Sequence, residues 1–178
     1  DVTDIIEAEE DREAVSALAA EACGLALAEL KAMRAVEGAK LCEDLLARCG
    51  VVEGLAAKIA LRAPLVVEEY RQRLQERIAA LLGGVEIDPA RLAAETAIFA
   101  DRASIDEELV RLSSHCEQLR AMLAGSEPAG RKLDFIVQEM NREFNTMGSK
   151  ANDAEIVKLV IAGKAEIEKI REQVQNIE

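Results

Sequence analysis

The chain has 178 residues and a formal net charge of −12; half of the residues are hydrophobic, yet only 2% are aromatic and three are proline. This balance excludes a generally basic nucleic-acid surface and an aromatic core, and Glu21 and Glu29 interrupt the most apolar run, which excludes a membrane span. The four cysteines show no CxxC spacing, which favours a reduced, cytoplasmic setting over a disulfide framework.

Residues 1–86 are predicted to form a long helical region that starts near Glu7, because Ala, Leu and Glu dominate this part of the sequence. Breaks are expected at the glycines between residues 38 and 54, which leaves open whether one interrupted helix or two are formed. A further boundary is expected at Pro64, because proline disfavours helical backbone at the residue before it. The apolar stripe that follows is expected to end at Gly83: Val67, Tyr70, Leu74, Ile78 and Leu81.

Residues 87–178 are predicted to contain four helices, at about 89–102, 104–124, 131–147 and 153–177. Asp88 and Pro89 are typical of a helix start, with the aspartate as N-cap and the proline at the first helical position. Ser104 and Glu107 have the spacing of a capping box. The face of the second of these helices is expected to be apolar: Ile105, Leu109, Leu112, Cys116, Leu119 and Leu123.

The last helix is expected to follow a stop at Gly148 and to be capped by Asn152 or Asp153. Its apolar residues alternate in steps of four and three, which predicts a heptad seam: Ile156, Val160, Gly163, Ile167, Ile170, Val174 and Ile177. Packing within one chain and packing between subunits both fit this pattern. The predicted fold is all-α, an elongated multi-helix bundle in one module with a coiled-coil-like C-terminal helix.

The stretch from Gly130 to Lys150, GRKLDFIVQEMNREFNTMGSK, is unusually rich in Asn, Thr and Ser, which are indifferent or poor helix formers. At about 100° per residue its apolar side chains form one arc that is expected to be buried: Leu133, Ile136, Val137, Met140, Phe144 and Met147. Glu139 and Glu143 lie four residues apart on one border of the arc, so their carboxylates are neighbours.

The candidate metal ligands are Glu108, Glu139 and Glu143, and the candidate catalytic residues are Glu139, Glu143 and His115. Carboxylate oxygens and water are the ligands that Mg²⁺ and Mn²⁺ prefer. His115, the only histidine, shares a helix border with Glu108, which is expected to orient one of its ring nitrogens. The sequence leaves open whether His115 binds metal, transfers a proton or is a partly buried structural residue.

The candidate RNA-binding residues belong to the same polar stretch. Cationic side chains suit phosphates, and amide and hydroxyl side chains suit ribose or base edges, including the 2′-hydroxyl that distinguishes RNA. They are Arg131, Lys132, Asn141, Arg142, Asn145, Thr146 and Lys150. Phe135 is the one aromatic candidate on this polar surface. A buried polar network that fixes subunit register is the structural alternative.

Four segments together carry a family resemblance: GRKLDFIVQEMNREFNTMGSK, MRAVEGAKL, IDEELVRLSSH and EIEKIREQVQNIE. They resemble the YicC-like endoribonuclease family, in order and over nearly the whole chain, as the C-terminal half of a member whose separate N-terminal domain is expected to be absent. The resemblance implies cleavage of single-stranded or structured RNA with a divalent metal, by a homo-oligomer that is a hexamer. The chain departs from the family pattern at Phe144, where a small residue is usual, and near Gly163, where a larger one is usual.

Three functional hypotheses follow. The first is a metal-dependent endoribonuclease that hydrolyses RNA phosphodiester bonds with Mn²⁺ or Mg²⁺ and without a small-molecule cofactor. The second is a non-catalytic helical module that oligomerises and captures RNA, and whose catalysis needs the N-terminal domain. The third has His115 promoting metal-independent attack by the ribose 2′-hydroxyl, which leaves cyclic-phosphate ends.

Overall fold

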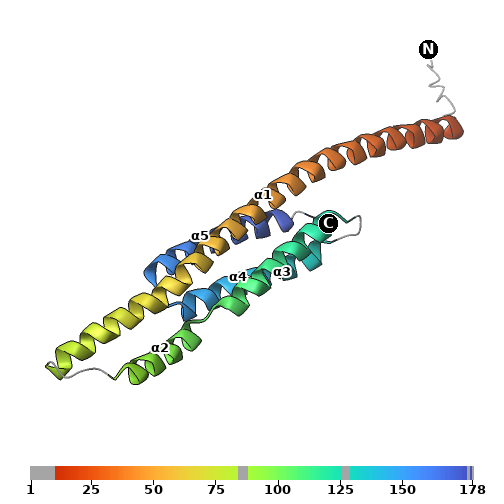
Figure 1. Ribbon diagram of the computed structural model, residues 1–178. Coiled ribbons are helices and arrows are strands. Elements are labelled where there is room, and N and C mark those ends of the chain that lie inside the picture. The colour runs from red at the N-terminus through yellow and green to blue at the C-terminus, as the bar shows by residue number, and fades with distance from the viewer. Residues whose placement is uncertain (1–10, 84–87, 126–128, 176, 178) are drawn as a thin grey trace, which may run out of the picture. The chain divides into compact units, whose positions relative to one another are not determined.

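The computed structural model describes residues 11–83, 88–125, 129–175 and 177. These residues form helices and no strand: α1 (Arg12–Leu82), α2 (Pro89–Ala103), α3 (Asp106–Leu123), α4 (Gly130–Lys150) and α5 (Ala154–Val174) (Figure 1). The prediction of an all-α fold is confirmed. Among these helices, none combines the length and the apolarity that crossing a bilayer requires.

The contacts of the chain fall into two compact units, residues 1–42 and residues 43–178. The breaks predicted at the glycines between residues 38 and 54 are wrong, because α1 is helical throughout this interval. A Cβ on Gly50 or Gly54 would meet nothing within 4 Å, so neither glycine marks a close contact. Each glycine destabilises the helix by about 1 kcal/mol relative to alanine, which a long helix tolerates.

The boundary predicted at Pro64 is also wrong, because α1 continues through this proline. Pro64 cannot donate to the carbonyl of Ala60, but Ala60 is exposed and water is able to satisfy that oxygen. Ile59 and Val66, on either side of the proline, are buried. Tertiary packing on both sides therefore holds the helix together against the local preference.

The buried side chains of α1 in the second unit recur mainly at intervals of seven residues, as in helices that pack along their length: Leu45, Cys49, Val52, Ile59 and Val66. The part of α1 in the first unit differs, because its residues from 12 to 40 are all exposed. They include several large apolar side chains: Val15, Leu18, Leu25, Leu27, Leu30, Met33 and Val36. An extended apolar surface of this kind is typical of a protein contact.

Within the second unit, α4 packs against both α3 and α5 (Figure 1). The predicted apolar arc of α4 is confirmed, since all six of its members are at most 3% exposed. The predicted seam of α5 is confirmed at six positions, which are buried: Ile156, Val160, Gly163, Ile167, Ile170 and Val174. This seam packs within the chain, because Gly148 and Phe144 of α4 lie against Val160 and Gly163 respectively.

The start of α2 follows the prediction, whereas the start of α3 does not. Asp88 caps α2 by accepting a hydrogen bond from the Ala90 amide at 3.0 Å. The capping box predicted at Ser104 is wrong. The N-cap of α3 is the next residue, Ile105, and no side chain caps this helix. Ser104 instead ends α2 by donating its amide to Asp101. Ile105 is 1% exposed, so its burial sets where α3 begins.

The connection between α4 and α5 is made by Asn152 rather than by the predicted stop at Gly148. Helix α4 continues to Lys150, and a Cβ on Gly148 would lie 3.2 Å from Val160, so this glycine allows close packing between helices. Asn152 has a φ of 46°, in the left-handed region that asparagine tolerates better than most residues. Asp153 then caps α5, which confirms one of the two predicted caps.

Arg62 ties α1 to the start of α5. Its Nη2 donates to Asp153 at 2.8 Å and to Glu69 at 2.9 Å. Asp153 also accepts a hydrogen bond from the amide of Ile156 at 2.9 Å. One carboxylate therefore caps α5 and fixes its first turn against α1.

Replacing Asp153 by alanine is expected to destabilise the fold by more than Asp88→Ala, which removes a solvent-exposed cap worth about 1 kcal/mol. The hydrogen bond from Arg62 lowers the pKa of Asp153. Its contribution is therefore complete above the unfolded carboxyl pKa of about 3.9 and is lost as the pH falls through the lower folded value. Urea unfolding of both variants and of the wild type, from neutral to acidic pH, measures this; equal losses in the two variants would contradict it.

Candidate functional site

The only histidine meets two carboxylates between α3 and α4. His115 of α3 and Glu139 and Glu143 of α4 each present one possible ligand atom, and these atoms lie within 4.8 Å of one another. Glu143 is 5% exposed, whereas His115 and Glu139 are half-buried and so within reach of solvent. The structure thus brings together the three residues that the sequence singled out for catalysis.

Arg111 neutralises the most buried of these carboxylates. Its Nε lies 3.2 Å from Glu143 Oε1, and its two Nη atoms lie 2.5 Å from Glu107 and 3.3 Å from Glu108. The contacts with Glu107 and Glu108 lie within α3, whereas the contact with Glu143 joins α3 to α4. A buried carboxylate needs such a partner, since an unpaired charge there is strongly destabilising.

Glu108 is not a member of the group formed by His115, Glu139 and Glu143, although Arg111 contacts both Glu108 and Glu143. It is 1% exposed, and its Oε1 accepts a hydrogen bond from Lys150 Nζ at 2.8 Å. Burial alone would raise the pKa of Glu108, but the ammonium of Lys150 and the nearby Arg111 outweigh burial and lower it. Glu108 and Lys150, expected as a metal ligand and a phosphate-binding residue, therefore neutralise each other across α3 and α4.

The expectation that Glu108 orients His115 is wrong, because Oε1 of Glu108 accepts hydrogen bonds from Lys150 and Arg111 and its Oε2 makes none to His115. The Nδ1 atom of His115 is buried and has no hydrogen-bond partner among the described residues. Glu108 Oε2 is in the same condition. Buried polar atoms are normally satisfied, so the unpaired Nδ1 of His115 is a feature that a bound ligand or water would explain.

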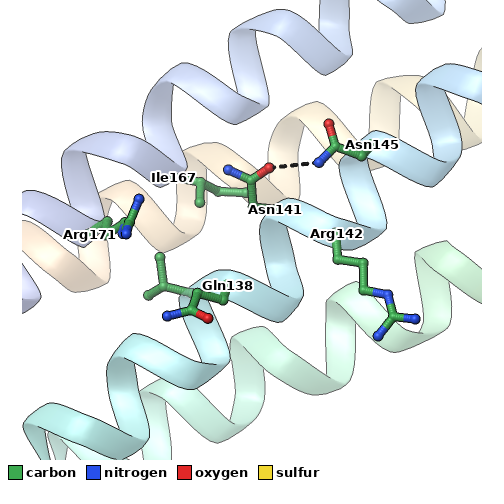
Figure 2. A pocket seen from close by; sticks show the side chains of 7 residues that line it. Gln138, Asn141, Arg142, Asn145, Ile167 and Arg171 are labelled. Carbon is green, nitrogen blue, oxygen red and sulfur yellow. Dashed lines mark hydrogen bonds between the residues drawn. The ribbon is translucent and has the colours of Figure 1, made fainter.

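A polar pocket lies between α4 and α5 (Figure 2). Its volume is about 360 Å³, and it is lined by Val137, Gln138, Asn141, Arg142, Asn145, Ile167 and Arg171. Asn145 donates to Asn141 at 3.0 Å and accepts from Lys164 at 2.7 Å. Three of the predicted RNA-binding residues, Asn141, Arg142 and Asn145, thus share one pocket, to which α5 adds Arg171.

Arg142 connects the pocket to the carboxylate group. Its side chain is 74% exposed, lines the pocket, and places Nη1 3.8 Å from Glu139 Oε2. Arg171, which sequence analysis did not single out, lies 3.8 Å from Asp134. Only the packing of α5 on α4 brings Arg171 to this pocket, so the spacing of residues within α4 gave no indication of it.

The remaining predicted RNA-binding residues lie outside the pocket lining. Arg131 and Lys132 are exposed at the start of α4. The Thr146 hydroxyl donates to the carbonyl of Arg142 at 3.1 Å, in the back-bonding arrangement common for threonine in helices. Phe135 is 62% exposed, as expected for the one aromatic candidate on this surface.

Comparison with known proteins gives a consistent result. Residues 59–178 match the family described as "Endoribonuclease YicC-like, C-terminal". The whole chain is similar to a "Probable endoribonuclease YicC" of Clostridioides difficile (strain 630), with 46% identity over 61% of that protein. A "Probable endoribonuclease YicC" of Haemophilus influenzae is 35% identical over 98% of this chain and 60% of its own length. The chain thus spans about three fifths of these curated relatives.

Proposed function

Since the chain belongs to the YicC-like endoribonuclease family, we propose that the site between α3 and α4 hydrolyses RNA phosphodiester bonds with a divalent metal ion. The observation that carries this proposal is the convergence of His115, Glu139 and Glu143 on one point, with Arg142 beside Glu139. Two carboxylates and an imidazole in a partly exposed position are a donor set for a divalent cation.

The donor set fits a metal ion of the Mn²⁺ class. Glu139, Glu143 and His115 would hold the ion, and His115 has an unpaired buried ring nitrogen that a ligand or a proton donor is able to satisfy. Imidazole nitrogen suits transition metals better than Mg²⁺, so this set favours Mn²⁺ over Mg²⁺. When bound, the ion supplies a Lewis acid for a phosphate oxygen and a water of lowered pKa.

The other side chains act on the RNA. Arg142 has paired N–H donors that match a phosphate group, and its position beside Glu139 places these donors next to the proposed reacting centre. Asn141 and Asn145 present amides in the neighbouring pocket, where ribose hydroxyls or base edges suit them. The net charge of −12 repels phosphates elsewhere on the chain, so RNA contact is confined to this local surface.

A homo-oligomer is part of the proposal, as the family resemblance implies. The exposed apolar side chains between Val15 and Val36 support it, because such a surface is typical of a protein contact. A hexamer is the proposed state, and sedimentation measurements test it.

The second candidate function is RNA capture without cleavage. The observation in its favour is that the polar pocket between α4 and α5 is complete within this chain, which spans only about 60% of its curated relatives. Binding without catalysis by this chain, together with cleavage by a longer member of the family, is what this candidate predicts.

Labelled RNA is expected to be cleaved by this chain in Mn²⁺, more slowly in Mg²⁺, and not at all when EDTA removes the metal. Gel separation of the products and analysis of their ends provide the measurement. Hydrolysis leaves no cyclic phosphate, whereas attack by the ribose 2′-hydroxyl promoted by His115 leaves cyclic-phosphate ends that survive EDTA.

Each outcome assigns one function. Cleavage that stops in EDTA supports the metal-dependent hydrolase. Binding without cleavage at any metal concentration, with a longer family member active in parallel, supports the capture module. Cyclic-phosphate ends formed in EDTA would refute the metal proposal in favour of the mechanism through His115.

A further inference from the structure

A second group of metal-ligating side chains lies between α1 and α3. The Sγ atoms of Cys49 and Cys116 and a carboxylate oxygen of Glu53 lie within 4.8 Å of one another. Both cysteines are 0% exposed. Cys116 follows His115 directly in α3, and consecutive helical side chains point about 100° apart, so the two groups face different neighbours.

The spacing of these three atoms is close to that of a metal site. A tetrahedral Zn²⁺ has sulfur ligands at about 2.3 Å and carboxylate oxygens at about 2.0–2.2 Å, which places the ligand atoms roughly 3.4–3.8 Å apart. Separations of at most 4.8 Å therefore require a closure of at most about 1.4 Å. Rotation of side chains accommodates such a change, because Cys49 and Glu53 stand one turn apart on α1 and face α3 together.

Arg120 supports the carboxylate and balances the charge of the group. It donates two hydrogen bonds to Glu53, from Nη1 to Oε1 and from Nη2 to Oε2, the latter at 2.5 Å. A carboxylate that accepts two hydrogen bonds still has lone pairs for a metal, and ligating carboxylates are normally held in this way. Two thiolates and one carboxylate with a divalent ion carry a net charge of −1, which the guanidinium of Arg120 neutralises.

An open pocket borders the group at Glu53. It has a volume of about 290 Å³ and is lined by Glu53, Ala56, Ala57, Ala60, Leu109 and Ser113. Alanine side chains keep this pocket wide enough for water and for a hydrated ion. Neither cysteine lines this pocket, so solvent in it meets the group at Glu53 alone.

We propose that Cys49, Cys116 and Glu53 bind a thiophilic divalent metal ion of the Zn²⁺ class, which fastens α1 to α3. Binding converts two thiols to thiolates and releases two protons to solvent, while Glu53 binds as the carboxylate and water completes the coordination. This site is separate from the one formed by His115, Glu139 and Glu143 and is independent of the proposed RNA cleavage.

Co²⁺ titration of the reduced chain is expected to show one strong sulfur-to-cobalt charge-transfer band that saturates at one equivalent and is displaced by Zn²⁺. The band is expected to be lost in Cys49→Ala and in Cys116→Ala. It is expected to persist in Cys23→Ala/Cys42→Ala, which removes the two remaining cysteines, and in His115→Gln/Glu139→Gln/Glu143→Gln. Thermal unfolding is expected to shift to higher temperature with Zn²⁺ in the wild type and in both of these controls.

Glu53→Gln keeps both thiols, so this variant still tests the proposed metal site if an alanine variant fails to fold. It is expected to weaken Co²⁺ binding by about 10-fold or more, as the loss of a ligand or of its support does at other metal sites. Absence of the band in the reduced wild-type chain would overturn the proposal. Loss of the band in Cys23→Ala/Cys42→Ala would overturn it as well, and so would unchanged Co²⁺ affinity in Glu53→Gln.

Discussion

Replacing Glu139 and Glu143 together by glutamine is expected to lower RNA cleavage at least about 100-fold while the helical content stays unchanged. Glutamine keeps the size of each side chain but removes the negative charge, so both proposed carboxylate ligands are lost at once. The fold is expected to survive, because Arg111 retains Glu107 at 2.5 Å and Glu108 at 3.3 Å after Glu143 is neutralised. Cleavage rates in Mn²⁺ and circular dichroism of the same preparations measure the two effects.

Glu168→Gln/Glu172→Gln is the matched control for this experiment. These two glutamates are also four residues apart on one helix, and replacing them changes the net charge by the same amount. The control is expected to cleave RNA at the wild-type rate. Wild-type cleavage by the variant of Glu139 and Glu143 would refute their role as ligands, and unfolding of that variant would indicate instead that they belong to a structural polar network.

The helices and their buried faces could be predicted because each depends on residues that are near one another in the sequence. The apolar arc of α4 from Leu133 to Met147 follows a period of 3.6 residues, and the seam of α5 follows alternating steps of four and three. The burial of the members of both stripes follows directly from these periods. The capping of α2 by Asp88 is equally local and was predicted correctly.

The errors concern places where tertiary packing overrides a local preference. Pro64 lies inside α1 because Ile59 and Val66 are buried on either side of it. Ser104 loses the predicted cap because burial of Ile105 moves the start of α3. Propensity and capping rules describe a chain segment by itself, so neither outcome was accessible from the sequence.

The site was predictable only within each helix. The pair Glu139 and Glu143 follows from a spacing of four residues, and its approach to His115 required the packing of α3 on α4. The partners of Glu108 and the place of Arg171 in the pocket required the same knowledge of packing. Sequence patterns specify which residues share a face, whereas the pairing of faces is a property of the folded chain.

Phe144→Ala is expected to have the largest effect on stability, a loss of about 3–5 kcal/mol in the free energy of unfolding. The phenyl ring is 0% exposed and fills the gap that Gly163 leaves in the seam of α5. Removing the ring leaves a cavity opposite a residue without a side chain, so the neighbouring helices have little means of closing it. Urea or thermal unfolding monitored by circular dichroism gives the measurement.

Across the α4–α5 interface a large residue, Phe144, faces a residue without a side chain, Gly163. A Cβ on Gly163 would overlap ring atoms Cε1 and Cζ of Phe144. Gly163→Ala alone is therefore expected to be destabilising, because overpacking of about 1–3 kcal/mol exceeds the gain of about 1 kcal/mol in helix propensity.

Phe144→Ala/Gly163→Leu reverses the sizes of the two residues and tests whether they are coupled. It is expected to be more stable than Phe144→Ala, because the leucine occupies the volume that the ring vacates and glycine is removed from a helix interior. The stabilities of the wild type, Phe144→Ala, Gly163→Leu and the double variant form a double-mutant cycle whose coupling free energy is expected to exceed about 1 kcal/mol. Additive effects of the two replacements would show that Phe144 and Gly163 do not compensate each other.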